Sequence, residues 1–74
     1  MITKTQTNII NYLVVCVNVF AERFDMTAKS AFAYLSEYGG IDFLLEHYEI
    51  EHTLSLDDAI DDLQTICSKS GGHL

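Results

Sequence analysis

Apolar residues recur at spacings of three and four along most of this chain, a period typical of helices that pack on one face. Proline is absent, and the four glycines lie in two pairs at residues 39–40 and 71–72, so few positions break a helix. The pattern predicts an all-α fold, a single domain over residues 1–74 with short flexible ends at about 1–5 and 70–74. The helices are expected at residues 7–24, 28–38, 41–50 and 56–69.

The first predicted helix has an unusually wide apolar surface. Its middle, residues 12–17, is rich in β-branched residues and resembles a strand, but the run is long and Asn11, Asn18 and Glu22 share one helical face. Apolar side chains cover about 220° of its circumference, more than a peripheral helix of a monomer needs. The candidate contact residues on this helix are Val14, Val15 and Val19, of which Val15 lies among the polar residues.

The second predicted helix has a clear beginning and a clear end. Thr27 is a good N-cap, because its hydroxyl oxygen accepts a hydrogen bond from a free amide of the first turn. Gly39 is expected to end the helix in the left-handed conformation, which other residues enter at a steric cost. Tyr34 falls outside the apolar stripe, so we predict that it lies on a contact surface, where tyrosine is enriched. The stripe itself comprises Ala28, Ala31, Phe32, Leu35 and Tyr38.

The third and fourth predicted helices meet near Tyr48, His52 and Thr53. We expect the His52 imidazole to bond a free carbonyl and the Thr53 hydroxyl to satisfy a loop amide, which makes a structural joint. The alternative is that these residues border a small pocket. Ser55 caps the fourth helix in this interpretation. The buried stripe of that helix is expected to comprise Leu56, Ala59, Ile60, Leu63, Ile66 and Cys67.

The chain is acidic, with a net charge of −7 at pH 7, and the charge is unevenly distributed. Residues 1–36 sum to +1, from three basic and two acidic residues, whereas residues 37–74 sum to −8, from nine acidic residues and one lysine. Such a surface repels phosphate backbones, so we expect no nucleic-acid partner. A protein with a basic surface is the partner that this charge favours.

Four aspartates, Asp57, Asp58, Asp61 and Asp62, are expected on the outer face of the fourth helix. Paired carboxylates catalyse acid–base reactions in a cleft or bind calcium in a loop, and a regular helix provides neither. Like charges four residues apart destabilise a helix by about 0.3 kcal/mol for each pair. A solvated helix face is the simple interpretation, and a basic partner that converts this repulsion into affinity is the functional one.

The sequence indicates no cofactor and no catalytic site. Cys16 lies among valines and Cys67 near a helix C-terminus, surroundings that disfavour a thiolate, so both are expected in the core. His47 and His52 are five residues apart, whereas helical metal ligands lie three or four apart, so we expect no metal. Two cysteines are too few for a disulfide framework, and the sequence shows no apolar signal segment, so we expect the protein in the cytoplasm. The apolar run 9–21 has 13 residues, against about 20 needed to cross a membrane, so we expect no membrane partner.

An ordered set of short motifs is similar to a known family. The motifs are Phe20-Ala21-Glu22, Thr27 with Ala31-Phe32, Tyr38-Gly39, Ile41-Asp42, Tyr48 and His52-Thr53. In this order and spacing the chain resembles, over about residues 8–66, the small bacterial proteins grouped as domain of unknown function 3791. The resemblance implies a small helical cytosolic protein, often encoded beside a larger protein of ADP-ribosyltransferase type, as in a toxin–antitoxin pair. It implies no catalytic or ligand-binding residues.

These observations lead to three hypotheses about function. The first is a protein–protein interaction module without catalytic activity, an antitoxin-like or accessory subunit that restrains a larger partner of ADP-ribosyltransferase type. The second is a structural module that buries its surplus apolar surface in a homodimer. The third is a small-ligand binder or enzyme with a pocket near Tyr48 and His52.

Overall fold

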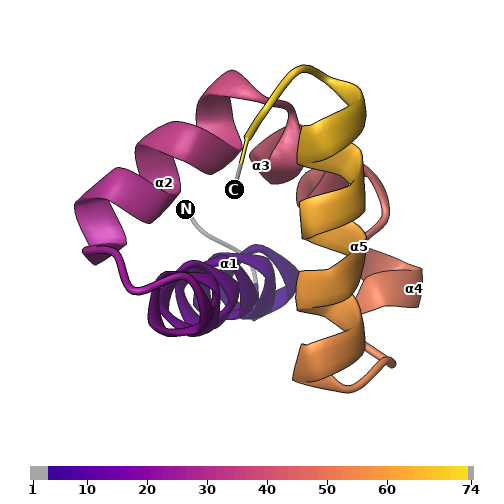
Figure 1. The fold of residues 1–74 in the computed structure, drawn as a ribbon. Coiled ribbons are helices and arrows are strands. Elements are labelled where there is room, and N and C mark those ends of the chain that lie inside the picture. The colour runs from indigo at the N-terminus through magenta and orange to yellow at the C-terminus, as the bar shows by residue number, and fades with distance from the viewer. Residues whose placement is uncertain (1–3, 74) are drawn as a thin grey trace.

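The computed structural model describes the backbone of residues 4–73 and the side chains of residues 8–73. The residues described form five helices and no strand. Figure 1 views α1 nearly along its axis, with α2 and α5 arranged around it and α3 between α2 and α5. The helices are α1 (Lys4–Arg23), α2 (Ala28–Glu37), α3 (Gly40–Glu46), α4 (Tyr48–Glu51) and α5 (Leu56–Lys69).

The all-α prediction is confirmed, but two helix boundaries differ from it. α1 begins at Lys4 instead of residue 7, so part of the predicted flexible N-terminal end is helical. The predicted third helix, 41–50, is divided at His47, whose backbone angles (φ −112°, ψ 22°) end α3 and begin α4. The predicted flexible residues 1–3 and 74 lie outside the described part of the chain.

The helix ends that the sequence predicted from capping residues are in place. The Ser30 amide donates a hydrogen bond to the Thr27 hydroxyl oxygen (3.1 Å), and the Asp58 amide donates to the Ser55 hydroxyl oxygen (3.1 Å). Gly39 has a φ of 84°, the left-handed conformation, and separates α2 from α3. Each hydroxyl cap satisfies an amide that has no partner within its helix, which contributes about 1 kcal/mol.

The core lies where α1 meets α2, α3 and α5. Phe20 of α1 is at its centre, and its ring centroid lies 4.7 Å from that of Phe24 and 5.8 Å from that of Tyr34. Both cysteines are fully buried, as predicted. Burial of a large apolar side chain stabilises the fold by about 2 kcal/mol. The largest fully buried side chains are Phe20, Leu35, Leu44, Ile60, Leu63, Cys16 and Cys67.

The start of α3 packs closely against α2 and α5 because Gly40 has no side chain. A Cβ atom at this position would lie 2.7 Å from Leu35 Cδ2 and 3.2 Å from Cys67 Sγ. Leu35 and Cys67 are both fully buried and have little room to move away. Gly40 therefore sets how closely these three helices approach.

α2 is rotated about its axis relative to the stripe that the sequence predicted. Tyr34, expected on a contact surface, is only partly exposed, and its ring packs against Phe20 and lies 4.9 Å from that of Tyr38. Phe32, expected in the core, is 53% exposed. In this orientation Tyr34 contacts the aromatic rings of both Phe20 and Tyr38, and such aromatic pairs are favourable beyond the area that they bury. Tyr34 therefore packs on the core with part of its surface exposed, and its place on a contact surface stays a prediction.

The C-terminal residues fold back onto the domain. The Ser70 and Gly72 amides donate hydrogen bonds to carbonyls of the last turn of α5, and that of Gly72 reaches the Cys67 carbonyl at 2.8 Å. Gly72 is buried against the Tyr34 hydroxyl, where a Cβ atom would clash. Residues 70–72, predicted as a flexible end, thus form a packed turn.

Gly40→Ala tests the close approach of α2, α3 and α5. We expect the free energy of unfolding to fall by about 1 to 3 kcal/mol, because the added Cβ overpacks the contact with Leu35, and Tm to fall by about 5 to 15 °C. Thermal unfolding followed by circular dichroism measures the change. Ser36→Ala, on the exposed face of α2, is the control and should be nearly neutral. An unchanged Tm for Gly40→Ala would contradict the packing described.

Candidate functional site

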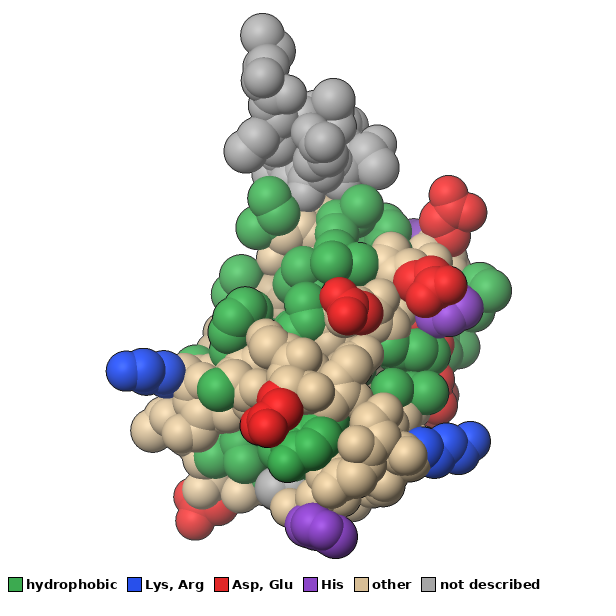
Figure 2. Space-filling view, turned by 90° about the horizontal axis from the view of Figure 1, so that it is seen from above, with side chains coloured by type: hydrophobic (Ala, Val, Ile, Leu, Met, Phe, Trp, Pro, Cys, Tyr) green, Lys and Arg blue, Asp and Glu red, His purple; other side chains and the backbone are tan. Residues whose placement is uncertain are grey.

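An apolar groove lies between α1 and α2 and is the first candidate site. Val14 and Phe32, one from each helix, are 54% and 53% exposed, although both are large apolar residues. They face a hollow of about 390 Å³ whose walls are almost entirely apolar. Figure 2 shows one face of the molecule, on which hydrophobic side chains reach the surface in patches between scattered charged ones. The residues lining the α1–α2 groove are Val14, Val17, Asn18, Ala28, Lys29 and Phe32.

A second, polar hollow adjoins the α1–α2 groove at the C-terminal end of α1. It measures about 570 Å³ and shares Asn18 and Ala28 with the groove. Its charged residues are Glu22 and Asp25, both exposed. The full lining is Asn18, Ala21, Glu22, Asp25, Met26 and Ala28. We call this region the acidic hollow.

Asp25 occupies a position that usually suits glycine. Its φ is 53°, and the Met26 amide donates to the Ala21 carbonyl (2.9 Å) while the Asp25 amide donates to that of Glu22 (3.4 Å). This is the Schellman arrangement that closes a helix, with aspartate at the left-handed residue. The conformation costs about 1 kcal/mol relative to glycine, and a negative charge at a helix C-terminus is unfavourable as well. The chain therefore keeps a carboxylate here against two local costs.

The other predicted contact residues of α1 are only partly where the sequence placed them. Val15 is 42% exposed and neighbours the exposed Asn11 and Asn18, as expected from the helical period. It does not line the α1–α2 groove. Val19 packs against the core and is only partly exposed, and its role as a contact residue stays a prediction. Val14 is thus the one of the three valines that belongs to the groove.

Three of the four aspartates of α5, Asp57, Asp58 and Asp61, are exposed to solvent, and Asp62 is only partly exposed. Arg23 reaches across from α1 and donates from Nη1 to Asp61 Oδ1 (2.5 Å), while its Nη2 lies 3.4 Å from Asp57 Oδ1. One guanidinium thus screens the repulsion between the two aspartates four residues apart. Asp58 is exposed at the first turn of α5, where its charge suits the helix dipole, and Asp62 turns toward Glu51 of α4.

Tyr48, His52 and Thr53 form the structural joint that the sequence predicted. The His52 ring stacks on that of Tyr48 with centroids 4.5 Å apart, and Nδ1 lies 2.7 Å from the Tyr48 carbonyl, to which it donates. The Thr53 hydroxyl donates to the Ile50 carbonyl (2.6 Å), so it satisfies an acceptor and not the loop amide that we expected. Tyr48 also packs edge-on against Tyr12 of α1 at 5.5 Å, which fixes α4 against α1.

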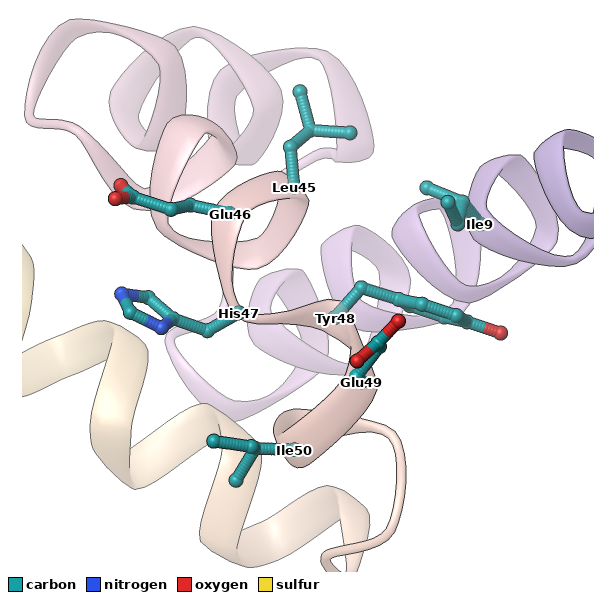
Figure 3. A pocket seen from close by; sticks show the side chains of 7 residues that line it. All are labelled: Ile9, Leu45, Glu46, His47, Tyr48, Glu49 and Ile50. Carbon is teal, nitrogen blue, oxygen red and sulfur yellow. The ribbon is translucent and has the colours of Figure 1, made fainter.

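A hollow of about 380 Å³ lies beside this joint, between α1 and the α3–α4 junction. Figure 3 shows that the side chains around it diverge: Glu46 and His47 point to one side, whereas the Tyr48 ring extends to the other, on the side of Ile9. His52 is not among the residues that line it. Polar groups that bind a small ligand converge on it, and these do not. The third hypothesis, a small-ligand site, has no support in this arrangement.

A buried polar cluster lies on the inner side of the same joint. Glu51 of α4 is 4% exposed, and its carboxyl lies against that of Asp62. Burial is the main cause that raises the pKa of Glu51 to about 7, and its hydrogen bond with Asp62 and the charge of Asp62 act in the same direction. The Tyr12 hydroxyl and Glu51 Oε1 are buried and accept or donate no hydrogen bond within the described residues. Burial also raises the pKa of Tyr12, with the nearby Cys16 thiol contributing.

The residues 4–73 contain no group of three or more histidine, cysteine or acidic side chains placed to hold a metal ion. Burial raises the pKa of the Cys16 and Cys67 thiols, which makes both poor nucleophiles. None of the described helices combines the length and the apolar character that crossing a membrane requires.

The sequence interpretation missed three features of these sites. Phe32 was assigned to the core because it shares a helical spacing with Ala28 and Leu35. Glu51 was given no role, although it follows an apolar run and precedes the predicted joint. Glu22 and Asp25 were not proposed as binding residues. A signal was present at Asp25 alone, because an acidic residue just beyond a helix C-terminus is unfavourable.

The comparisons with known proteins establish the family. The model of the family described as protein of unknown function (DUF3791) matches residues 11–70, most of the chain. The chain belongs to this family. The match covers α2 to α5 and all of α1 after residue 10, so the α1–α2 groove, the acidic hollow and the polar cluster all lie within the family's domain. No curated protein and no solved structure matches the chain.

The Glu51–Asp62 pair predicts an unusual dependence of stability on pH. The pKa of Glu51 is about 7 in the folded state, above the value of about 4.3 in an unfolded chain. The folded state therefore binds the proton more tightly, and this contribution is complete below about pH 4.3 and lost as pH rises through 7. As pH rises from 5 to 8, the free energy of unfolding of Glu51→Gln should increase by about 2 to 3 kcal/mol relative to that of the native chain, which loses this contribution. Urea unfolding across this range measures the difference.

Glu49→Gln is the matched control, because Glu49 is exposed on the same helix. Its stability relative to the native chain should not change with pH. If the difference in the free energy of unfolding between Glu51→Gln and the native chain stays constant from pH 5 to pH 8, Glu51 is not protonated in the folded state over this range.

Proposed function

We propose that this protein is a non-catalytic protein–protein interaction module whose contact surface is the α1–α2 groove. The observation that carries the proposal is the exposure of Val14 and Phe32 on two facing helices around an apolar hollow. Leaving two large apolar side chains about half exposed forgoes about 1 kcal/mol each. A partner that covers the groove recovers this free energy on binding.

The size of the chain supports the same proposal. A domain of 74 residues buries a smaller share of its surface than a larger one and gains from association. The resemblance to DUF3791 implies the class of partner: a larger protein of ADP-ribosyltransferase type, which the module restrains as an antitoxin-like or accessory subunit in the cytoplasm. The net charge of −7 favours a partner whose contact surface is basic.

The proposed binding surface is tested with the pair Val14→Ser/Phe32→Ser. The tagged chain is purified from its native host, and the amount of each co-purified protein is measured by quantitative mass spectrometry. For a partner that co-purifies with the native chain, we expect the recovered amount to be about tenfold lower with the double variant, because the apolar contact is lost. Recovery at the native level would exclude the groove.

Val15→Ser is the matched control for this experiment. Val15 is exposed on the same helix but lies outside the groove, so its variant should recover the partner at the native level. Circular dichroism of all three chains confirms that they are folded. Equal losses with Val15→Ser and with the double variant would place the contact on another face of α1.

A homodimer is the alternative, and a second set of exposed apolar residues favours it. These residues do not line the groove; they lie on α3, on α4, in the loop that follows α4 and at the start of α5: Leu45, Ile50, Leu54 and Leu56. A two-fold contact between two copies would cover them. In that case sedimentation equilibrium should show a dimer mass that rises with concentration, and Ile50→Ser should shift the chain toward the monomer. A constant monomer mass would exclude this alternative.

A further inference from the structure

The α1–α2 groove and the acidic hollow form one continuous surface with two chemically distinct ends. They share Asn18 and Ala28 in their linings, so the two hollows adjoin. The groove end is apolar around Val14 and Phe32, and the other end contains two carboxylates. A segment long enough to pass Asn18 and Ala28 can therefore contact both ends.

The carboxylates of the acidic hollow form no ion pair with the described side chains of residues 8–73. The nearest basic residue along the chain, Arg23, is directed to α5, where it binds Asp57 and Asp61. Within residues 8–73, Arg23 makes all of the ion pairs, and neither Glu22 nor Asp25 has one. The carbonyls at the C-terminus of α1 add to the negative potential there. This end of the surface therefore favours a cation.

We propose that this surface binds a segment of the partner protein that carries a large apolar side chain and a lysine or arginine at a fixed separation. The apolar side chain fills the groove between Val14 and Phe32, and the cation lies over Glu22 and Asp25. This proposal rests on the proposed function and adds the chemistry of the segment that is recognised.

The geometry of α1 sets the separation of the two groups. Val14 and Glu22 are eight residues apart on one helix, which corresponds to about 12 Å along its axis. An extended segment spans this distance in three or four residues, and a helical one in seven or eight. The apolar and basic residues of the partner segment should therefore occur at one of these two spacings.

A second copy of this chain is a poorer occupant than a different protein. The chain has four basic residues; Arg23 is already paired, and Lys29 lies on the groove itself. Two copies, each with a net charge of −7, also repel one another. The charge of the surface therefore suits a basic segment of a different protein better than a second copy of this acidic chain.

The experiment uses a random peptide library of 12 residues, displayed on phage and selected against the purified full chain. Peptides enriched on the native chain, and not on Val14→Ser/Phe32→Ser, are sequenced, synthesised and measured by fluorescence anisotropy. We expect them to share a large apolar residue and a lysine or arginine at a spacing of three to four or seven to eight. Their affinity should fall as salt concentration rises, because an exposed ion pair is screened.

The double variant Glu22→Gln/Asp25→Asn tests the basic residue directly. Asparagine tolerates the left-handed conformation of Asp25, so the loop should remain folded. We expect peptide affinity to fall about fivefold and the salt dependence to flatten. Glu46→Gln/Glu49→Gln is the control: it removes two exposed carboxylates outside the groove, which gives the same net charge of −5 (−7 + 2), and it should bind as the native chain does.

Three results would overturn the inference. Enriched peptides without a basic residue, or with equal affinity for the two charge variants, would show that the acidic hollow plays no part. No enrichment over Val14→Ser/Phe32→Ser would show that the surface takes no single segment. A dimer of the native chain that Val14→Ser/Phe32→Ser abolishes would make a second copy the occupant. A result that excludes the acidic hollow, or a lack of enrichment, leaves the co-purification result unaffected, and with it the proposed function.

Discussion

The missing side chain of Gly40 determines how the rest of this small domain is arranged. Because no Cβ stands between α3, Leu35 and Cys67, the end of α2, the start of α3 and the end of α5 pack as one unit. The left-handed Gly39 before it makes the turn short enough for α3 to follow α2 at once. The opposite end of α2 has no comparable contact with α5, so α1 and α2 meet there in a groove that other helices do not cover.

Two regions of the protein forgo stability in different ways. The α1–α2 groove leaves apolar area in water, which a protein partner can recover. The polar cluster instead buries the carboxyl of Glu51 beside Asp62, which raises the pKa of Glu51 to about 7. Beside that cluster, the Tyr48 ring packs on Tyr12 and on His52, which connects α4 to α1. Natural proteins commonly depart from the most stable choice at sites that serve a function.

Helical periodicity and local capping allowed much of the fold to be predicted from the sequence. Thr27, Gly39 and Ser55 mark their helix ends through bonds and backbone angles that involve only neighbouring residues, and these predictions were correct. The break at His47 was not predicted, because Ile41, Leu44 and Tyr48 continue one apolar stripe across it. It arises from contacts between distant residues, above all the packing of Tyr48 on Tyr12. Tyr34 packs on the core and Phe32 is exposed, whereas the sequence predicted the reverse. This difference has the same origin, because the position of Phe20 in another helix decides which of the two aromatic residues is buried.

The two buried thiols make this protein a convenient subject for the study of its own motions. Cys16 lies in the middle of α1 and Cys67 near the end of α5, and both are inaccessible to solvent in the folded chain. A thiol reagent can reach either residue only when the surrounding helices separate, so each reaction rate reports an opening event. If Cys67 reacts faster than Cys16, the C-terminal turn and α5 detach while α1 stays packed. Equal rates would mean that the domain opens as a single cooperative unit. Because both thiols are native, the experiment needs no introduced cysteine.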